Sequence, residues 1–363
     1  MATTQSPALS SLDSTALREA VDAVLTQFLD EQRDHPPDAG LVAEAAQLTE
    51  AVRGFLAAGG KRLRPLLCVL GWAAAGGRGD TSPVFRVAAS LEMFHAFALI
   101  HDDVMDRSET RRGRPTLQHT LTAAHAHGTA DAEEVGASAA LLVGDLVFAW
   151  SCRLLHTAGL REDRLSAVLS LVDDMRSEVM YGQFLDLVAG GRSGADVEAA
   201  VRIARHKTAS YTIEYPLRIG AALADAPTTL HRVLSEFGRP LGEAFQLRDD
   251  LLGVFGDPDC TGKPVVDDLR AGKHTALLAL ALQRADPGQR AALDAVVGDP
   301  SFTEDDASRV RGIFAATGAR DTVEQMISDR YAQAVRALER VPFPPAAAEA
   351  MRGLADAVVA RTT

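Results

Sequence analysis

The chain has 363 residues, of which 47% are hydrophobic, so it can bury a sizeable core in one large domain or two small ones. Its formal net charge of −12 excludes a generally attractive field for nucleic acid or anionic lipid, so any polyanionic substrate must be held locally. Cys68, Cys152 and Cys260 are odd in number and far apart, which argues against a disulfide framework and favours a reducing, cytoplasmic location.

The chain begins with residues 1–14, which are rich in Ser, Thr and Ala and have neither a basic start nor an apolar stretch. We expect a flexible N-terminal tail here and no signal peptide. From about Leu17 onward, apolar residues recur at three- and four-residue spacings, and no run of alternating β-branched residues occurs. This pattern predicts an all-α fold of roughly ten or more helices.

Clusters of Gly, Pro and polar residues mark the breaks between the predicted helices. They lie at 34–40, 75–83, 124–133, 190–195, 224–228, 256–273 and 286–288. No break is long or low-complexity enough to separate domains, so we expect residues 15–363 to form a single all-α domain. The most apolar segment, 136–150, contains Asp145 and is shorter than the roughly 20 residues of a membrane span, so we expect no stable membrane insertion.

Three carboxylates, Asp102, Asp103 and Asp106, end an apolar helical segment that starts near Leu91. At about 100° per residue, Asp106 lies only about 40° from Asp102 around the helix, and Asp103 points aside. Like charges one turn apart repel, which predicts a compensating cation. Mg²⁺ is the natural candidate because it takes hard oxygen ligands and bridges one or two carboxylates to substrate phosphates.

A DDxxD string by itself is more often a solvated acidic patch, but cationic residues lie on both sides of this one. They are Lys61, Arg62 and Arg64 upstream, beside two glycines, and Arg107, Arg111, Arg112 and Arg114 downstream. Guanidinium groups suit bidentate capture of phosphate oxygens. His95 lies two turns before Asp102 on nearly the same face, which favours a polar contact with a substrate over an ordinary core position.

A second acidic pair, Asp249-Asp250, follows Gln246 and ends another apolar helix that begins near Leu234. The loop after it carries Gly262-Lys263 and Gly272-Lys273, where glycine permits close backbone approach to a phosphate and the ammonium supplies charge. With Lys207-Thr208, these lysines predict a ring of cations around an anionic ligand.

Together these motifs resemble the trans-isoprenyl diphosphate synthases, the polyprenyl synthetase family that includes farnesyl and geranylgeranyl diphosphate synthases. They follow the family's order over more than half the chain: Gly-Gly-Lys-Arg-Leu-Arg-Pro at 59–65, DDxxD within 92–106, Arg111-Arg112, Gly182-Gln183 with Asp186, Lys207-Thr208 and Phe-Gln-Leu-Arg-Asp-Asp at 245–250. The resemblance implies an isoprenoid-synthase fold, in which two aspartate-bearing helices face each other across a deep cavity, usually within a homodimer.

The resemblance also assigns roles to residues. It implies that Asp102 and Asp106 bind two Mg²⁺ ions and Asp249 a third, all bridging to an allylic diphosphate. The same diphosphate would be held by Arg111, Lys207, Thr208, Gln246, Lys263 and Lys273. Isopentenyl diphosphate would be held by Lys61, Arg64, His95 and Arg112. The implied reaction condenses the two substrates to an all-trans polyprenyl diphosphate, and the metal ions and cations stabilise the leaving diphosphate.

Two positions bear on the product and on activity. The second aspartate motif lacks its last carboxylate, because Gly253 stands there and Asp257 is the next acid. In the family, product length depends on bulky residues below the first aspartate motif, where a tunnel holds the growing chain. Here small Ala98, four residues before Asp102, leaves the upper tunnel open, and Phe97 and Phe94 lie five and eight residues before Asp102. This arrangement resembles the geranylgeranyl-forming (C20) pattern more than the farnesyl-forming one, although both phenylalanines can also be ordinary core residues.

Two other functions stay open. A class I terpene cyclase shares the first aspartate motif, but it needs no isopentenyl site, so Lys61, Arg64 and Arg112 count against it. A non-catalytic partner subunit of a prenyl synthase is favoured only by Gly253. Incubation with Mg²⁺, isopentenyl diphosphate and a dimethylallyl, geranyl or farnesyl primer distinguishes elongation, cyclisation and no reaction.

Overall fold

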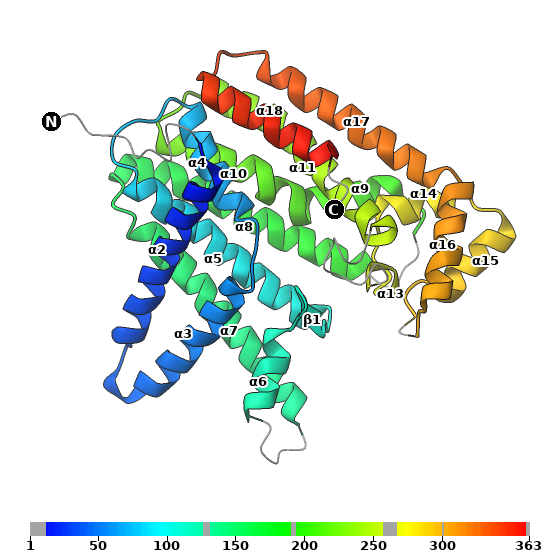
Figure 1. Ribbon diagram of the computed structural model, residues 1–363, viewed down its shortest axis with the longest axis horizontal. Coiled ribbons are helices and arrows are strands. Elements are labelled where there is room, and N and C mark those ends of the chain that lie inside the picture. The colour runs from blue at the N-terminus through cyan, green and yellow to red at the C-terminus, as the bar shows by residue number, and fades with distance from the viewer. Residues whose placement is uncertain (1–11, 126–130, 190–193, 257–266, 300, 361–363) are drawn as a thin grey trace. The chain divides into compact units, whose positions relative to one another are not determined.

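The computed structural model describes residues 12–125, 131–189, 194–256, 267–299 and 301–360. Almost all of these residues lie in helices (Figure 1), which confirms the predicted all-α class. Within the described ranges, the only strands are β1 (Thr110–Arg111) and β2 (Arg114–Pro115), which form a short antiparallel hairpin.

Contacts between residues divide the chain into two compact units. The first comprises Met1–Val69 and Arg78–Leu165, and the second comprises Leu70–Gly77 and Ser166–Thr363. The single domain expected over 15–363 stays a prediction.

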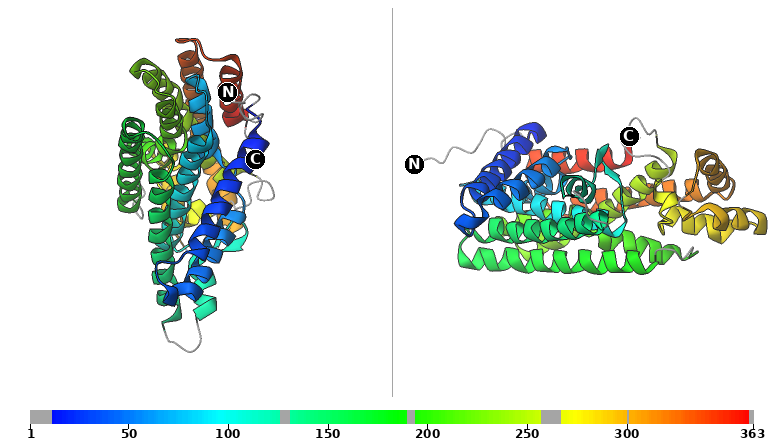
Figure 2. Two further views of the ribbon diagram at one scale, coloured as in Figure 1. Left: turned by 90° about the vertical axis from the view of Figure 1, so that its left-hand side faces the viewer. Right: turned by 90° about the horizontal axis from the view of Figure 1, so that it is seen from below.

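The first unit is built around one long, buried helix, α5. Its helical elements are α2 (Ser14–Asp34), the short 3₁₀ helix η1 (Ala39–Leu41), α3 (Val42–Ala57), the start of α4 (Leu63–Ala74), α5 (Ser82–Met105), α6 (Leu117–His125) and α7 (Ala132–His156). Pro83 occupies the first turn of α5, where its missing N–H costs no hydrogen bond. α5 packs against α7 and α2, and α2 and α3, both blue in Figure 2, lie side by side.

The core of the first unit follows from the composition of α5. Apolar residues surround this helix on nearly all sides, as is typical of a buried helix. Val87, Leu91 and Phe94 are at most 2% exposed. Phe28 of α2 meets Trp150 of α7 edge to face, with ring centroids 6.2 Å apart. The core of the first unit thus consists of α5 with α2 and α7 packed against it.

The second unit is arranged around α11. Its helical elements are α8 (Glu162–Ala189), α9 (Val197–Ala204), η2 (Arg205–Glu214), α10 (Tyr215–Leu223), α11 (Thr228–Phe255), α13 (Asp267–Arg270), α14 (Ala276–Arg284), α15 (Pro287–Val296), α16 (Glu304–Ala316), α17 (Ala319–Leu338) and α18 (Pro345–Ala360). α11 packs mainly against α17 and η2 and buries Phe237, Leu241 and Ala244 completely. The element η2 is a π-helix.

Two helices, α5 and α7, are long and apolar enough to cross a membrane by length and composition. This is weak evidence, since core helices of soluble proteins pass the same test, and the apolar window of α5 is 67% buried. The segment 136–150 belongs to the 25-residue helix α7, so the argument that it is too short to span was wrong. The absence of stable membrane insertion stays a prediction.

Candidate active site

The first aspartate motif lies at the C-terminal end of α5. The backbone N–H of Asp106 donates to the carbonyl oxygen of Asp102 at 2.8 Å, and the helix ends there. The side chain of Asp102 is 19% exposed and Asp106 is exposed, whereas the side chain of Asp103 is only 2% exposed. The negative end of the helix dipole favours a cation beside the two accessible carboxylates.

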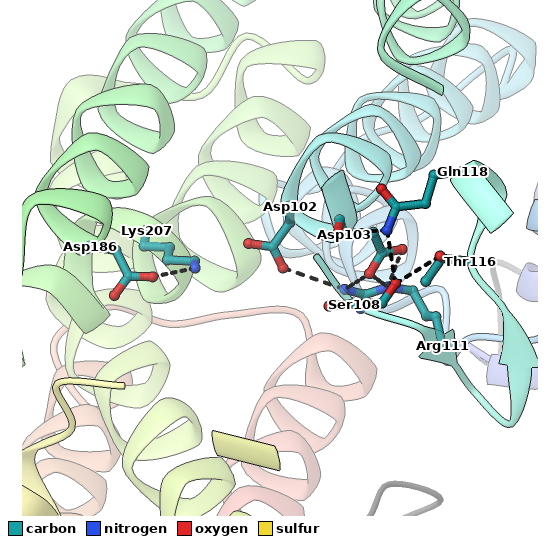
Figure 3. Close-up of polar contacts among 8 residues, drawn as sticks. All are labelled: Asp102, Asp103, Ser108, Arg111, Thr116, Gln118, Asp186 and Lys207. Carbon is teal, nitrogen blue, oxygen red and sulfur yellow. Dashed lines mark hydrogen bonds and ion pairs between the residues drawn. The ribbon is translucent and has the colours of Figure 1, made fainter. Parts of the chain in front are cut away.

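The buried member of the motif, Asp103, binds the guanidinium of Arg111 (Figure 3). Arg111 Nε donates to both carboxylate oxygens of Asp103, at 2.7 and 2.8 Å, and Arg111 Nη2 lies 3.4 Å from Asp102 Oδ2. Burial acts to lower the pKa of Arg111, but Asp103, Asp102 and Asp106 outweigh it and raise that pKa. Arg111 therefore supplies part of the compensating charge that the sequence analysis expected from a metal ion.

The loop between α5 and β1 is fixed by side chains that follow the hairpin. Thr116 Oγ1 and Gln118 Nε2 donate to the carbonyl oxygen of Ser108, at 2.8 and 3.0 Å (Figure 3). The N–H of Ser108 donates to the carbonyl oxygen of Asp103 at 2.9 Å. The carboxylates at the end of α5 and the hairpin are thus joined by a closed set of hydrogen bonds.

A two-residue turn places the arginine pair. Arg111 lies opposite Arg114 in the hairpin, so Arg112 and Gly113 form the turn, with φ angles of 54° and 71°. Positive φ at both positions is what a type I′ turn requires, and its twist matches that of the strands. The hairpin was not predicted from the sequence, where this stretch reads as a run of cations. Gly113 directly after Arg112 was the available signal.

His95 lies in strongly cationic surroundings within the first unit. Its pKa is lowered well below its ordinary value of 6.5, first by burial and then by the positive charges of Arg64, Arg112, Arg111 and Arg62. We call these four residues the arginine group. The imidazole is therefore neutral at neutral pH, while fixed positive charge surrounds it. Such an environment suits an anion.

The glycine loop that precedes α4 lies against this arginine group. A Cβ added at Gly60 would lie 3.1 Å from Arg112 Nη2 and 3.3 Å from Arg62 Nη1. The next residue, Lys61, is exposed, while Arg64 in the first turn of α4 is only 9% exposed. The structure thus brings the loop, Arg64 and Arg112 into one neighbourhood, and the isopentenyl diphosphate site there stays a prediction.

Arg62 has a different role from the other cations. It is 7% exposed and donates to Glu92 Oε1, Asp22 Oδ1 and the carbonyl oxygen of Leu56, at 2.9, 2.8 and 2.9 Å. These three partners come from α5, α2 and α3. Arg62 therefore anchors the loop between α3 and α4, which the sequence analysis could not distinguish from ligand binding.

In the second unit, Lys207 lies on η2 and pairs with Asp186 of α8. Its Nζ is 2.5 Å from Asp186 Oδ2 (Figure 3), and the two side chains are 21% and 19% exposed. Thr208 follows Lys207 and is partly exposed. Asp186 belongs to one of the family's motifs, but no role was predicted for it from the sequence. Its carboxylate forms an ion pair with the lysine that was predicted to bind diphosphate.

The second aspartate motif lies near the end of α11, which continues to Phe255. Gln246 Nε2 donates to Asp250 Oδ1 at 2.9 Å, and Asp249 and Asp250 are partly exposed. Lys273 is also partly exposed. Lys263, Asp257 and Cys260, which the sequence analysis named, lie outside the described residues. Gln246, predicted to hold diphosphate, is bonded within the motif itself.

Two of the residues predicted to set product length, Phe94 and Phe97, belong to an aromatic cluster between α5 and α7. The ring of Phe97 lies 5.5 Å from that of Phe94, 5.1 Å from that of Phe148 and 4.6 Å from that of His101, measured between centroids. Phe94 is 1% exposed, whereas Phe97 and Ala98 are partly exposed. Phe94 is therefore buried and Phe97 lies at the edge of the cluster, and their role in setting product length stays a prediction.

The sequence profile of the polyprenyl synthetase family matches residues 45–314. The chain belongs to this family, which confirms the resemblance drawn from the motifs. It is therefore a prenyltransferase with the all-α isoprenoid-synthase fold.

Individual relatives agree with this assignment. The chain is 35% identical to a geranylfarnesyl diphosphate synthase of Aeropyrum pernix, over 87% of this chain and 94% of that protein. It is 31% identical to a (2E,6E)-farnesyl diphosphate synthase of Mycobacterium tuberculosis, over 83% of this chain and 80% of that one. A crystal structure of geranylgeranyl pyrophosphate synthase from Corynebacterium glutamicum, complexed with isoprenyl diphosphate and magnesium, is 40% identical, covers 95% of this chain and 98% of its own, and superposes with a TM-score of 0.90. The products named for these relatives differ in chain length.

Proposed function

We propose that this protein condenses isopentenyl diphosphate with an allylic diphosphate and makes all-trans geranylgeranyl diphosphate. The observation that carries the proposal lies in the first unit. Two accessible carboxylates, Asp102 and Asp106, end α5 beside Arg111, and the charges of Arg64 and Arg112 act on a neutral His95. The two carboxylates suit a diphosphate held through metal ions, and Arg64 and Arg112 suit a diphosphate held directly by cations.

The proposed cofactor is Mg²⁺, with three ions in each site. The donor set fits, because Asp102, Asp106 and Asp249 offer hard oxygen atoms and each carries accessible carboxylate surface. No group of three or more metal-ligating side chains occurs among the described residues, so phosphate oxygens and water would complete the coordination. When bound, the ions stabilise negative charge on the departing diphosphate.

The side chains of this protein would divide between the two substrates. Lys61, Arg64, Arg112 and a neutral, hydrogen-bonding His95 would hold isopentenyl diphosphate in the first unit. Arg111, positioned by Asp103, would hold the allylic diphosphate, and we propose that Lys207, Thr208, Gln246, Lys263 and Lys273 hold it too. Fixed cations aimed at the leaving group lower the barrier to C–O cleavage, because negative charge develops there. The released diphosphate would accept the proton that the elongated product loses.

We propose a homodimer as the working assembly. On α8, Tyr181 is 70% exposed and Phe184 is 62% exposed, and Met180, Leu187 and Val188 extend the same apolar stripe. Soluble monomers rarely expose contiguous apolar patches of this kind, and an isologous contact with a second copy would cover it. Light scattering after size-exclusion chromatography tests this proposal: Phe184→Glu should yield monomers, and a wild-type monomer contradicts it.

One incubation tests the proposed reaction. The purified protein is mixed with Mg²⁺, isopentenyl diphosphate and, in turn, dimethylallyl, geranyl or farnesyl diphosphate, and the products are separated by chromatography. Elongation to a C20 diphosphate supports the proposal. Cyclic hydrocarbons would indicate a terpene cyclase, and no product from any primer would indicate a non-catalytic subunit.

A further inference from the structure

The segment that carries Lys207 has an unusual backbone. Residues Arg205–Glu214 form a 10-residue π-helix between α9 and α10, and the N–H of Tyr215 donates to the carbonyl oxygen of Ser210, five positions earlier. π-Helices are rare, usually one turn long, and frequent at functional sites. A run of this length must therefore be held in place by its neighbours.

Glycines let the neighbouring backbones approach the π-helix closely. A Cβ added at Gly182 of α8 would lie 2.2 Å from the backbone nitrogen of Lys207. One added at Gly242 of α11 would lie 2.6 Å from the carbonyl oxygen of Ala209. Real side chains do not tolerate these distances, so larger residues would displace η2 from both helices.

Glu178 of α8 binds both ends of the π-helix. Its Oε1 is 2.8 Å from His206 Nδ1, and its Oε2 accepts a hydrogen bond from the hydroxyl of Tyr215 at 2.9 Å. His206 is near the start of η2, and Tyr215 follows its last residue. The pKa of the Tyr215 hydroxyl is raised by burial and then by the charge of Glu178, as expected for a donor held against a carboxylate.

Glu178, Gly182 and Asp186 are spaced by four residues and line one face of α8. Glu178 forms hydrogen bonds with residues at both ends of η2, and Gly182 lets the backbone of η2 approach α8 closely. Asp186 forms an ion pair with Lys207. Because His206 directly precedes Lys207, a shift of His206 moves the lysine as well. α8 thus fixes both the place of the lysine and its direction.

We propose that Glu178 is a positioning residue for the allylic diphosphate, which it serves by holding the π-helix so that Lys207 stays in place beside Asp186. This inference rests on the proposed role of Lys207 as a ligand of that diphosphate. Glu178 itself needs no contact with substrate. Its effect is specific to one substrate, because the groups proposed to bind isopentenyl diphosphate belong to the first unit.

The test is steady-state kinetics on Glu178→Ala with each substrate varied in turn. Loss of two hydrogen bonds to a charged acceptor should raise the KM for the allylic primer about tenfold. The KM for isopentenyl diphosphate should stay within about twofold. Tyr215→Phe, which removes one of the two hydrogen bonds to Glu178, should also raise the KM for the allylic primer, but by less. If Glu178→Ala does not fold, the same KM values are measured on Tyr215→Phe and Glu178→Gln instead.

Asp356→Asn is the matched control, because the hydroxyl of Tyr331 donates to Asp356 Oδ1 at 2.7 Å in the same unit but away from η2. It should leave both KM values unchanged. An equal rise in both KM values in Glu178→Ala, or an unchanged primer KM, overturns the proposal. Lys207→Ala separates the two hypotheses: if it leaves the primer KM unchanged, the proposed role of Lys207 fails first.

Discussion

The guanidinium of Arg111 is bonded through Nε to both carboxylate oxygens of Asp103, at 2.7 and 2.8 Å, and the Asp103 side chain is 2% exposed. The middle aspartate of the motif thus faces away from solvent and fixes the arginine that follows it. This divides the motif into two accessible carboxylates and one internal anchor.

Asp103→Ala should destabilise the fold and abolish turnover. The substitution leaves a largely buried guanidinium without its main partner, which typically costs about 3 to 5 kcal/mol. The free energy of unfolding in urea measures the loss. Asp163→Ala serves as the control, because that carboxylate is 64% exposed and pairs with Arg161, and it should change stability by less than about 0.5 kcal/mol. Equal effects of the two substitutions would contradict the anchoring role.

Asp249→Ala should abolish turnover, whereas Gly253→Asp should change it only modestly. Asp249 carries the proposed metal-ligand role of the second motif, and we expect metal binding to need no further carboxylate at Gly253. Rates of product formation at saturating Mg²⁺ measure both. Asp305→Ala, at an exposed carboxylate in the first turn of α16, should leave the rate unchanged. Retained activity in Asp249→Ala would remove it from the metal site.

Gly60→Ala should raise the KM for isopentenyl diphosphate and leave the KM for the primer nearly unchanged. Gly60 has a φ of 150°, and its added Cβ would lie 3.1 Å from the Arg112 guanidinium, so the loop or the arginine must move. Gly54→Ala on α3 is the control, because no atom lies within 4 Å of a Cβ there. That change should stabilise the helix by roughly 0.5 to 1 kcal/mol and leave both KM values unchanged.

The lowered pKa of His95 predicts how stability depends on pH. Between that folded-state pKa and 6.5, the unfolded chain binds a proton that the folded chain does not bind. The contribution of His95 to the free energy of unfolding is therefore complete above pH 6.5 and is lost progressively as the pH falls below it. Urea unfolding of the wild type and of His95→Gln from neutral to mildly acidic pH measures the difference. Parallel pH profiles would contradict the prediction.

Phe97→Ala should lengthen the products. Its partly exposed ring lies at the edge of the aromatic cluster, so its removal opens space without emptying the core. Phe94→Ala is the contrasting variant, since Phe94 is 1% exposed and should cost about 3 to 5 kcal/mol of stability. Chromatography of the products from each primer measures chain length. An unchanged length in Phe97→Ala removes that residue from the floor of the tunnel.

The sequence predicted the helical class, several of the breaks between the described helices, and the position of the first aspartate motif at a helix end, because these depend on local periodicity and composition. It did not predict the hairpin at Arg112 and Gly113, since each strand has only two residues. It missed the π-helix η2, because that backbone depends on close approach by Gly182 and Gly242 from other helices. Such contacts leave no periodic trace in the sequence.

The sequence also could not separate cations that anchor from cations that bind. Only Leu63 separates Arg62 from Arg64 within the same motif, yet Arg62 is bonded to Glu92, Asp22 and Leu56. Likewise, Asp103 and Asp102 are adjacent, and only the fold shows which one is buried. Burial and partner choice are tertiary properties.

The bond from Arg62 to Asp22 extends the influence of the glycine loop to α2, a helix that contains none of the family's motifs. A substitution at Asp22 would therefore weaken the support of the loop between α3 and α4, which lies later in the chain. A purification tag or fusion partner that disturbs α2 would loosen the support of this loop.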